Sequence, residues 1–251
     1  MLTLDIWFFL LAAPAVMFAG VSKGGFGSGA SFASASILAL IVDPGVALGV
    51  MLPLLMLIDV ASLRPYWGQW NKPVAILLIS GGVPGIALGA WLFTVVEADV
   101  FRVLIGGISL GFVVWQISQR RGSVPTAKTE KPRWVGVVAG AVAGFTSFVS
   151  HAGGPAAAIY MLSMRFGKTE YQATSVIVFW ILNFVKFIPY AFLGMFTWQT
   201  ASANLLLAPF ALIGTWAGVK LHQRIPEKLF FGMTYVLLCV TGSKLIWDGL
   251  T

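Results

Sequence analysis

Long apolar runs dominate the chain and are separated by short polar segments. They lie at about 4–21, 26–42, 46–63, 73–96, 100–118, 134–149, 155–166, 171–193, 200–221 and 229–247. A helix needs roughly 20 apolar residues to cross the ~30 Å hydrocarbon core of a bilayer, because it rises ~1.5 Å per residue. Several runs reach that length, whereas the pair around 22–25 and the pair around 150–154 are shorter and are interrupted by glycine and serine. The pattern predicts an all-α polytopic membrane protein.

Composition supports this fold class. The 251 residues are 58% hydrophobic and only 10% charged, whereas ordinary soluble domains carry about 25% charged residues. So much apolar surface excludes a soluble enzyme, a nucleic-acid-binding protein and a disulfide scaffold. The single cysteine, Cys239, rules out an intramolecular disulfide. We interpret the formal net charge of +7 by its location in loops, where Lys and Arg orient membrane proteins.

Basic loops predict one orientation in the membrane. The longest polar stretch, 119–133, holds five basic residues and a single acid, Glu130, which indicates a cytoplasmic linker by the positive-inside rule. From this linker outward, the remaining loops alternate between basic and neutral or acidic. The loops expected inside hold Arg64, Lys72, Arg165, Lys168, Arg224 and Lys228, and those expected outside hold Asp43, Glu97 and Asp99. Both termini are therefore expected outside.

Five segments before the linker and five after it must then run in opposite senses. We expect a first transmembrane repeat at 1–118, the linker at 119–133 and a second, inverted repeat at 134–251. Each repeat would consist of a broken or re-entrant helical hairpin and three transmembrane helices. Matched positions support the two repeats: Gly85 and Gly89 with Gly214 and Gly218, Trp70 with Trp198, Gly27 with Gly153, and Ala47 with Ala173.

The two interrupted segments carry most of the polar residues within the apolar regions. They read VSKGGFGSG at 21–29 and TSFVSHAGGP at 146–155. In lipid, irregular backbone is tolerated only inside protein or along a water-filled cavity, and transporters with inverted repeats build binding sites from such interrupted helices. We therefore expect half-helices that begin near Phe26 and Pro155, with both tips near the middle of the membrane. The alternative, in which 4–21 and 26–42 both span fully, would make Lys23 a loop residue.

These segments suit a small oxyanion. The free N–H groups and positive dipole end of a half-helix attract anions, glycines let a ligand approach the backbone, and hydroxyls donate hydrogen bonds. Lys23 and His151 would add positive charge, and neither tip contains an acid. The predicted substrate-binding residues are Ser22, Lys23, Gly24, Gly25, Gly27, Ser28, Ser147, Ser150, His151, Gly153, Gly154 and Pro155.

Two ionisable residues interrupt the third and eighth segments, namely Asp59 and Lys186. Charges inside a span are costly and are usually paired, exposed to a cavity or functional. Asp59 could pair with Lys186, bind a coupling proton or lie near the inner interface with Arg64, and Lys186 could line the anion path or extend toward a headgroup. We predict coupling or gating roles for both. Two distant histidines and one cysteine predict no metal site.

The chain resembles the TauE/SafE family of sulfite exporters, also called toluene sulfonate uptake permeases. The resemblance covers nearly the whole length. It rests on GVSKGGFGSGASFAS followed by DPGVALGVMLPLLMLID in the first half, and on GFTSFVSHAGGPAAAIYML followed by KTEYQATSVIVFWILNFVKFIPY in the second. It implies a bacterial inner-membrane secondary transporter for sulfite, sulfonates or related sulfur-containing anions. On this chain the family's glycine-rich motifs correspond to residues 23–29 and 150–155.

Together these features predict a transporter that moves a small sulfur-containing anion by alternating access, in the direction of export. The alternatives are a passive anion channel and a transporter of a non-sulfur organic anion. No paired carboxylates or nucleophile–base set indicates an enzyme, and no cofactor is expected. The expected partners are the anionic substrate, the lipid bilayer and a coupling proton or ion, but no nucleic acid; a homodimer is left open.

Overall fold

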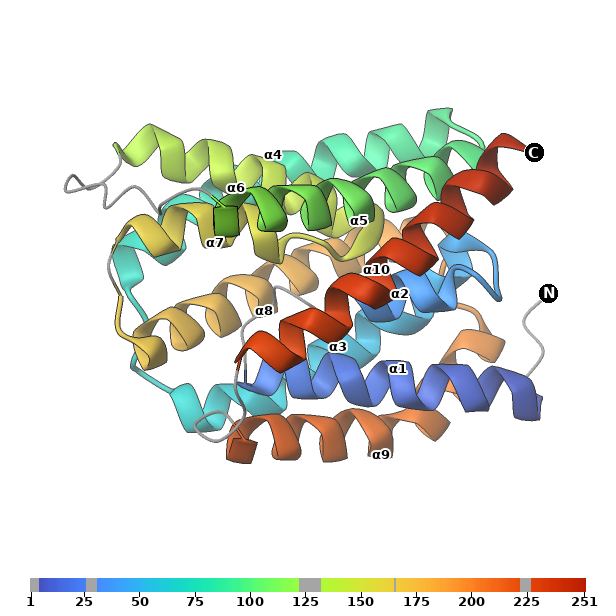
Figure 1. Cartoon of the computed structure of the whole chain (residues 1–251), viewed down its shortest axis with the longest axis horizontal. Helices are drawn as coiled ribbons and strands as arrows, with labels where there is room; N and C mark the ends of the chain where they lie inside the picture. Colours follow the sequence, from blue (N-terminus) through green and yellow to red (C-terminus); the bar gives the residue numbers. More distant parts are fainter. Residues whose placement is uncertain (1–4, 26–30, 122–131, 165, 222–226) are drawn as a thin grey trace.

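The computed structural model of the protein describes residues 5–25, 31–121, 132–164, 166–221 and 227–251. These residues fold into helices, with no strand among them, so the predicted all-α class is confirmed. The helices are α1 (Ile6–Gly25), α2 (Ala33–Leu38), α3 (Pro44–Tyr66), α4 (Lys72–Val95), α5 (Ala98–Arg121), α6 (Arg133–Ser150), α7 (Gly154–Ser163), α8 (Lys168–Phe192), α9 (Trp198–Leu221) and α10 (Glu227–Leu250) (Figure 1).

Within the described residues, seven helices are long and apolar enough to cross a membrane, namely α1, α3, α4, α5, α6, α8 and α9. Large apolar side chains cover much of the outer surface. Phe192 is 88% exposed and Trp198 is 85% exposed. In water, each such side chain would forgo the roughly 1.5–3 kcal/mol that burial provides. The surface is therefore built to contact lipid.

Two helices are too short to cross a membrane, and both follow the interrupted segments. Helix α2 has 6 residues and α7 has 10. Helix α7 begins at Gly154, next to the predicted start at Pro155, which takes an early position where its missing N–H costs no hydrogen bond. Helix α2 begins at Ala33, later than the predicted start near Phe26; residues 26–30, which include Gly27 and Ser28, lie outside the described residues.

Side-chain caps fix where α3 and α4 begin. The Asp43 side chain accepts a hydrogen bond from the Gly45 amide at 2.8 Å, and the Asn71 side chain accepts one from the Val74 amide at 3.2 Å. In both cases a proline follows within the first turn. An acceptor at the N-cap satisfies an otherwise unpaired amide. Asn71 also donates to Glu170 at 3.0 Å, which joins the start of α4 to the start of α8.

Glycines let two pairs of helices pack with their backbones in contact. A Cβ atom at Gly20 of α1 would lie 2.7 Å from the Ala211 carbonyl oxygen of α9, and Gly214 of α9 faces the Met17 carbonyl of α1. Helices α4 and α6 meet in the same way, through Gly144 against Gly82. Figure 1 shows α1 alongside α9 at one side of the molecule and α4 alongside α6 at the other. Small residues permit this close approach of helices in a membrane.

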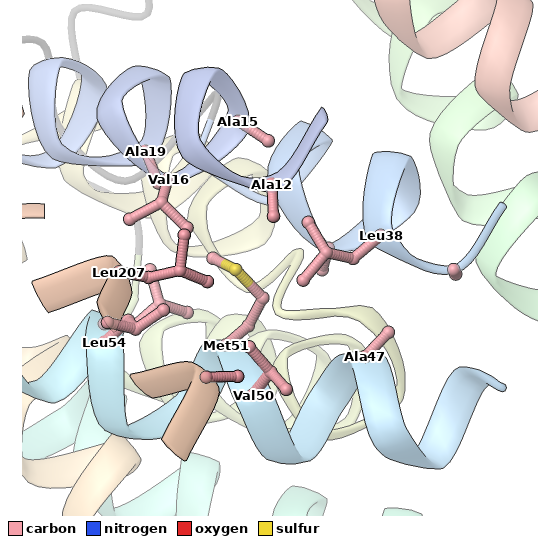
Figure 2. Close-up of a cluster of buried hydrophobic side chains, with 14 of the residues drawn as sticks. Ala12, Ala15, Val16, Ala19, Leu38, Ala47, Val50, Met51, Leu54 and Leu207 are labelled. Atoms are coloured by element: carbon pink, nitrogen blue, oxygen red, sulfur yellow. The ribbon is translucent and has the colours of Figure 1, made fainter. Parts of the chain in front are cut away.

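Helix α3 lies between these two packed pairs. One of its faces contributes Met51 and Leu54 to a buried cluster with α1, α2 and α9, including Val16 and Leu207 (Figure 2). Its other face contributes Leu48 to a second cluster with α4, α6 and α8. The buried polar side chains of α3, Asp59 and Ser62, are therefore enclosed by protein.

We predict that Gly144→Ala destabilises the protein while Gly107→Ala does not. The new Cβ at residue 144 would lie 2.7 Å from the Gly82 carbonyl carbon, whereas a Cβ at residue 107 meets nothing within 4 Å. Overpacking of this kind costs about 1–3 kcal/mol. Thermal unfolding of the two variants in the same detergent measures the difference. Equal melting temperatures would show that the α4–α6 contact does not depend on the missing side chain.

Candidate functional site

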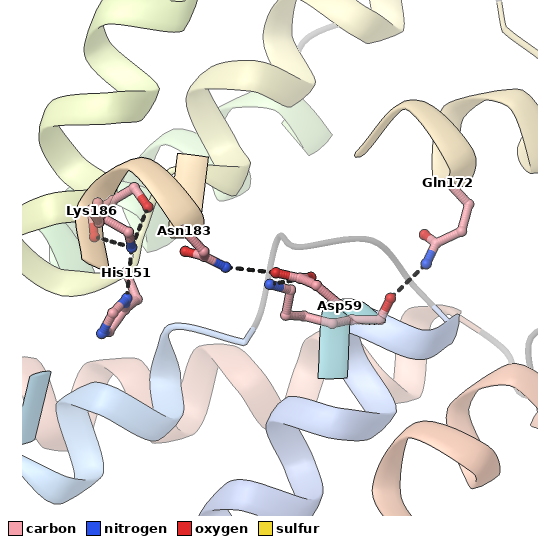
Figure 3. Close-up of polar contacts among 7 residues, drawn as sticks. Asp59, His151, Gln172, Asn183 and Lys186 are labelled. Carbon is pink, nitrogen blue, oxygen red and sulfur yellow. Dashed lines mark hydrogen bonds and ion pairs between the residues drawn. The ribbon is translucent and has the colours of Figure 1, made fainter. Parts of the chain in front are cut away.

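Polar side chains from four elements meet in the interior of the helix bundle. Asp59 comes from α3, Asn183 and Lys186 come from α8, Lys23 lies in the last turn of α1, and His151 follows the end of α6 (Figure 3). All five side chains are buried, with exposed fractions of 5% or less. The two interrupted segments of the sequence therefore both contribute to one interior polar cluster.

Lys23 and Asp59 form a buried ion pair. The Lys23 Nζ lies 2.6 Å from the Asp59 Oδ1, and the Asn183 amide donates to Oδ2 of the same carboxylate at 2.6 Å. The sequence suggests that Asp59 pairs with Lys186, binds a coupling proton or lies near the inner interface with Arg64; the structure pairs it with Lys23. Lys23 lies within α1 and is 3% exposed, so the alternative that it is a loop residue is wrong.

Lys186 makes three hydrogen bonds near the carboxyl end of α6. Its Nζ lies 3.0 Å from the Ser147 carbonyl oxygen, 2.9 Å from the Ser147 Oγ and 2.9 Å from the His151 Nδ1. The ammonium group has three hydrogens, and the three acceptors match them. Helix carboxyl ends favour cations. Lys186 thus lies inside the protein and does not extend toward a lipid headgroup.

His151 has an unusual backbone conformation. Its φ is 56°, which makes it the one non-glycine residue with positive φ among those described. A left-handed conformation costs a residue with a Cβ about 1–2 kcal/mol, so glycine or asparagine is usual at this helix-ending position. The imidazole Nε2 lies 3.3 Å from the Leu48 carbonyl oxygen while Nδ1 meets Lys186. The strained backbone therefore directs the ring between α3 and α8.

The other predicted residues of the first segment serve the contact between helices. Ser22, Gly24 and Gly25 are buried in the last turn of α1. A Cβ at Gly24 would lie 2.6 Å from the Thr215 carbonyl oxygen, and Gly25 faces the Gly218 carbonyl. Packing against α9 accounts for these glycines, and their role in binding substrate stays a prediction.

The second segment lies closer to the cluster. Ser150 is buried and donates to the Thr146 carbonyl at 3.1 Å. Gly153 and Gly154 are buried and Pro155 is half-buried. A Cβ at Gly153 would lie 2.7 Å from the Phe179 ring and 2.9 Å from the Ser147 Cβ. The same Phe179 ring lies 5.9 Å from the Lys23 Nζ, so both interrupted segments contact one aromatic side chain of α8.

A known protein family matches most of the chain. The model of the family described as sulfite exporter TauE/SafE matches residues 12–245. The chain belongs to the TauE/SafE family. No curated protein and no solved structure matches the chain. TauE/SafE proteins are membrane transporters, so the apolar helices are transmembrane and the buried polar cluster lies inside a transporter.

Four residues that belong to this cluster or bind the backbone beside it were not predicted from the sequence. Asn183 and Tyr190 lie on the same face of α8 as Lys186, at helical spacing, and the Tyr190 hydroxyl donates to the Phe148 carbonyl at 2.7 Å. Gln172 donates to the Lys23 carbonyl at 2.6 Å, and the Tyr66 hydroxyl donates to the Gly24 carbonyl at 2.9 Å. Spacing from Lys186 could have identified the first two. Gln172 and Tyr66 occur near helix ends, where polar residues are ordinary.

The cluster provides cationic and hydroxyl donors rather than metal ligands. No group of three metal-binding side chains occurs among the described residues. The donors that an incoming ligand could meet are Lys186, Lys23, the Ser147 hydroxyl and His151. This chemistry suits an anion with several oxygen atoms.

We predict that Asp59→Asn and Lys23→Met each destabilise the protein more than the double variant does. Removal of one partner leaves a buried charge without its counterion, at a cost of about 3–5 kcal/mol, whereas removal of both leaves none. Thermal unfolding of the three variants measures this coupling. Additive losses in the double variant would contradict the pairing of Lys23 with Asp59.

Proposed function

We propose that the chain is a secondary transporter that moves sulfite, an organosulfonate or a related small sulfur-containing anion across the inner membrane by alternating access, in the direction of export. The observation that carries this proposal is the buried Lys186, whose ammonium is held by Ser147 and His151 and has no acidic partner within ion-pair distance among the described residues. A charged group inside a membrane protein is costly and usually marks a substrate or ion pathway, and an ammonium whose partners are all neutral can still attract an anion.

In the proposed site, Lys186, His151 and the Ser147 hydroxyl contact the sulfur oxyanion. A sulfonate presents three oxygens. Lys186 and the Ser147 hydroxyl can donate to them once Lys186 turns from its present acceptors, and the His151 ring can donate through Nδ1 when it is protonated. Ser150, Gly153, Gly154 and Pro155 would line the same side, and Ser22, Gly24 and Gly25 the other; the predicted residues Gly27 and Ser28 lie outside the described residues. Lys23 would join them when it separates from Asp59.

The burial of the cluster favours a carrier over a channel. Lys186 and Asp59 are fully buried and His151 is 5% exposed. A channel needs a continuous water-filled path past its selective groups, whereas a carrier passes through a state in which the site is closed from both sides. The described state has the features of that closed state, and an anion reaches Lys186 only after neighbouring helices move.

We propose that two inverted repeats provide this movement. Support comes from glycine contacts that recur in the two helix pairs. Gly20 of α1 faces Ala211 of α9 as Gly144 of α6 faces Gly82 of α4, and Gly214 of α9 faces Met17 of α1 as Gly85 of α4 faces Ala141 of α6. The same differences in residue number relate α1 to α6 and α9 to α4 in both comparisons. In Figure 1 the α1–α9 pair and the α4–α6 pair run in opposite directions. Each pair would move as a unit about α3 and α8, which carry Asp59 and Lys186, the proposed coupling groups. The linker 119–133 would be cytoplasmic and both termini outside.

We predict that liposomes that contain the purified protein and are preloaded with unlabelled sulfite take up radiolabelled sulfite from outside, which is counterflow. Lys186→Met should abolish this uptake. A hydrogen bond to a charged group contributes about 1.5–3 kcal/mol, so binding should weaken about ten- to a hundredfold. The matched control is Lys220→Met, because Lys220 packs over the Trp216 ring away from the cluster. Flux without counterflow would indicate a channel, and undiminished counterflow in Lys186→Met would remove Lys186 from the site.

We further predict that His151→Gly lowers sulfite binding and lowers the stability of the fold only slightly. Glycine accepts the φ of 56° at no cost, so relief of backbone strain offsets part of the lost hydrogen bonds. His151→Asn, which also tolerates this conformation, serves as the control that restores a polar side chain. Thermal unfolding and titration calorimetry report the two effects separately. Unchanged affinity in both variants would show that the imidazole does not contact the anion.

A further inference from the structure

The charges of the buried cluster can be counted from its hydrogen bonds. Among the acidic side chains that the structure describes, only Asp59 is buried. Asp5, Asp43, Glu97 and Asp99 are exposed, and Glu170 and Asp248 are half-buried. Residues 26–30, which follow α1, contain no acid in the sequence. The negative charge available to the described cluster is therefore that of one carboxylate.

That carboxylate is already neutralised. Lys23 lies 2.6 Å from one oxygen of Asp59, and the uncharged Asn183 amide donates to the other. The titratable or charged groups that face Asp59 are Lys23 from α1 and Lys186 from α8. Lys186 is not within ion-pair distance of Asp59. The Lys23–Asp59 pair thus contributes no net charge to the cluster.

We assign one positive charge to the Lys186–His151 pair. The Leu48 carbonyl oxygen only accepts hydrogen bonds, so the His151 Nε2 that lies 3.3 Å from it carries a hydrogen. Nδ1 and the Lys186 Nζ are 2.9 Å apart, and a hydrogen bond between two nitrogens needs one hydrogen between them. An ammonium that donates to a neutral ring and a charged ring that donates to an amine both give one positive charge. The ammonium has three hydrogens for the three acceptors around Nζ, whereas a neutral amine has two and would have to accept from the Ser147 hydroxyl. The count therefore takes Lys186 as charged, which the experiment below tests.

This charge has no full counterion among the described residues. The groups that face His151 are Lys186 and Lys23, both basic, and the Tyr190 ring at 6.2 Å. The carboxyl end of α6 offers only about half a negative charge. A single uncompensated charge inside a membrane protein is expensive. A ligand with one negative charge would neutralise it, whereas a ligand with two would leave an excess negative charge buried.

Resting on the function proposed above, we propose that the site takes a monoanion, such as a sulfonate or hydrogensulfite, and that a dianion such as sulfate binds only together with one proton. The proton goes to Asp59, the one buried acid of the described cluster. Its protonation frees the Lys23 ammonium, so the cluster then carries two positive charges and matches a doubly charged ligand. Binding of a doubly charged substrate is thereby coupled to the protonation of Asp59.

Calorimetry on the purified protein tests this charge count. Ethanesulfonate is the probe with one charge at every working pH, and sulfate is the probe with two. We expect ethanesulfonate to bind with an affinity independent of pH and with no proton uptake, measured by titration in buffers of different ionisation enthalpy. Sulfate should bind at least about tenfold more weakly at mildly alkaline pH, and its binding should tighten with acidification as one proton is taken up.

Two variants separate charge from structure. Asp59→Asn leaves Lys23 charged, so sulfate should bind more tightly than to the wild type at alkaline pH and without proton uptake. The double variant Lys23→Met with Asp59→Asn preserves the single positive charge without the pair. It should keep the preference for ethanesulfonate and lose the proton uptake with sulfate. Asp248→Asn, whose partner Lys244 lies at the end of α10, is the control and should behave as wild type.

Each outcome bears on a different claim. Equal affinity for sulfate and ethanesulfonate at alkaline pH, with no proton uptake, would overturn the charge count and leave the proposed transport of sulfur-containing anions intact. Tighter binding of acetate than of either sulfur-containing anion would overturn the proposed substrate class. If the singly charged ligands still bound more tightly than sulfate at alkaline pH, the charge count would be supported. Absence of binding by every anion would overturn both.

Discussion

The rest of the structure depends on how a buried lysine ammonium is held within a membrane protein. Lys186 meets three acceptors, two of them on Ser147 and the third on His151. The Ser147 carbonyl oxygen already accepts from the His151 N–H, and its second lone pair accepts from Lys186. Helix α6 ends at Ser150, so the ammonium also lies at the negative end of its dipole. The break in the sequence at SHAGGP therefore provides both the helix end and the histidine that help to hold the interior charge.

The surrounding helices protect this arrangement from lipid and water. Glycine contacts hold α1 against α9 and α4 against α6, and α3 and α8 cross between these pairs with their polar residues turned inward. Asp59 and Lys186 consequently belong to two neighbouring charge systems. One is balanced by Lys23, whereas the other has no full counterion in the described part of the chain. That difference is the basis of the proposed preference for an anionic ligand.

Much of this could be predicted from the sequence, because the governing patterns are local. Run length predicts the helices, and glycine with proline predicts where α7 begins. Lys23, Asp59, His151 and Lys186 stand out because charge is rare in apolar segments. Which of them pair could not be predicted, since pairing depends on how helices far apart in the chain cross. The glycines of VSKGG likewise have two uses, backbone contact with α9 and approach to a ligand, and sequence does not distinguish them.

The most direct test of the central claim is a structure of the protein with bound bromomethanesulfonate, in which anomalous scattering locates the bromine. The account predicts sulfonate oxygens within hydrogen-bond distance of the Lys186 Nζ, with Lys186 turned from at least one of its present acceptors. A sulfonate bound elsewhere, with Lys186 still on Ser147 and His151, would contradict it.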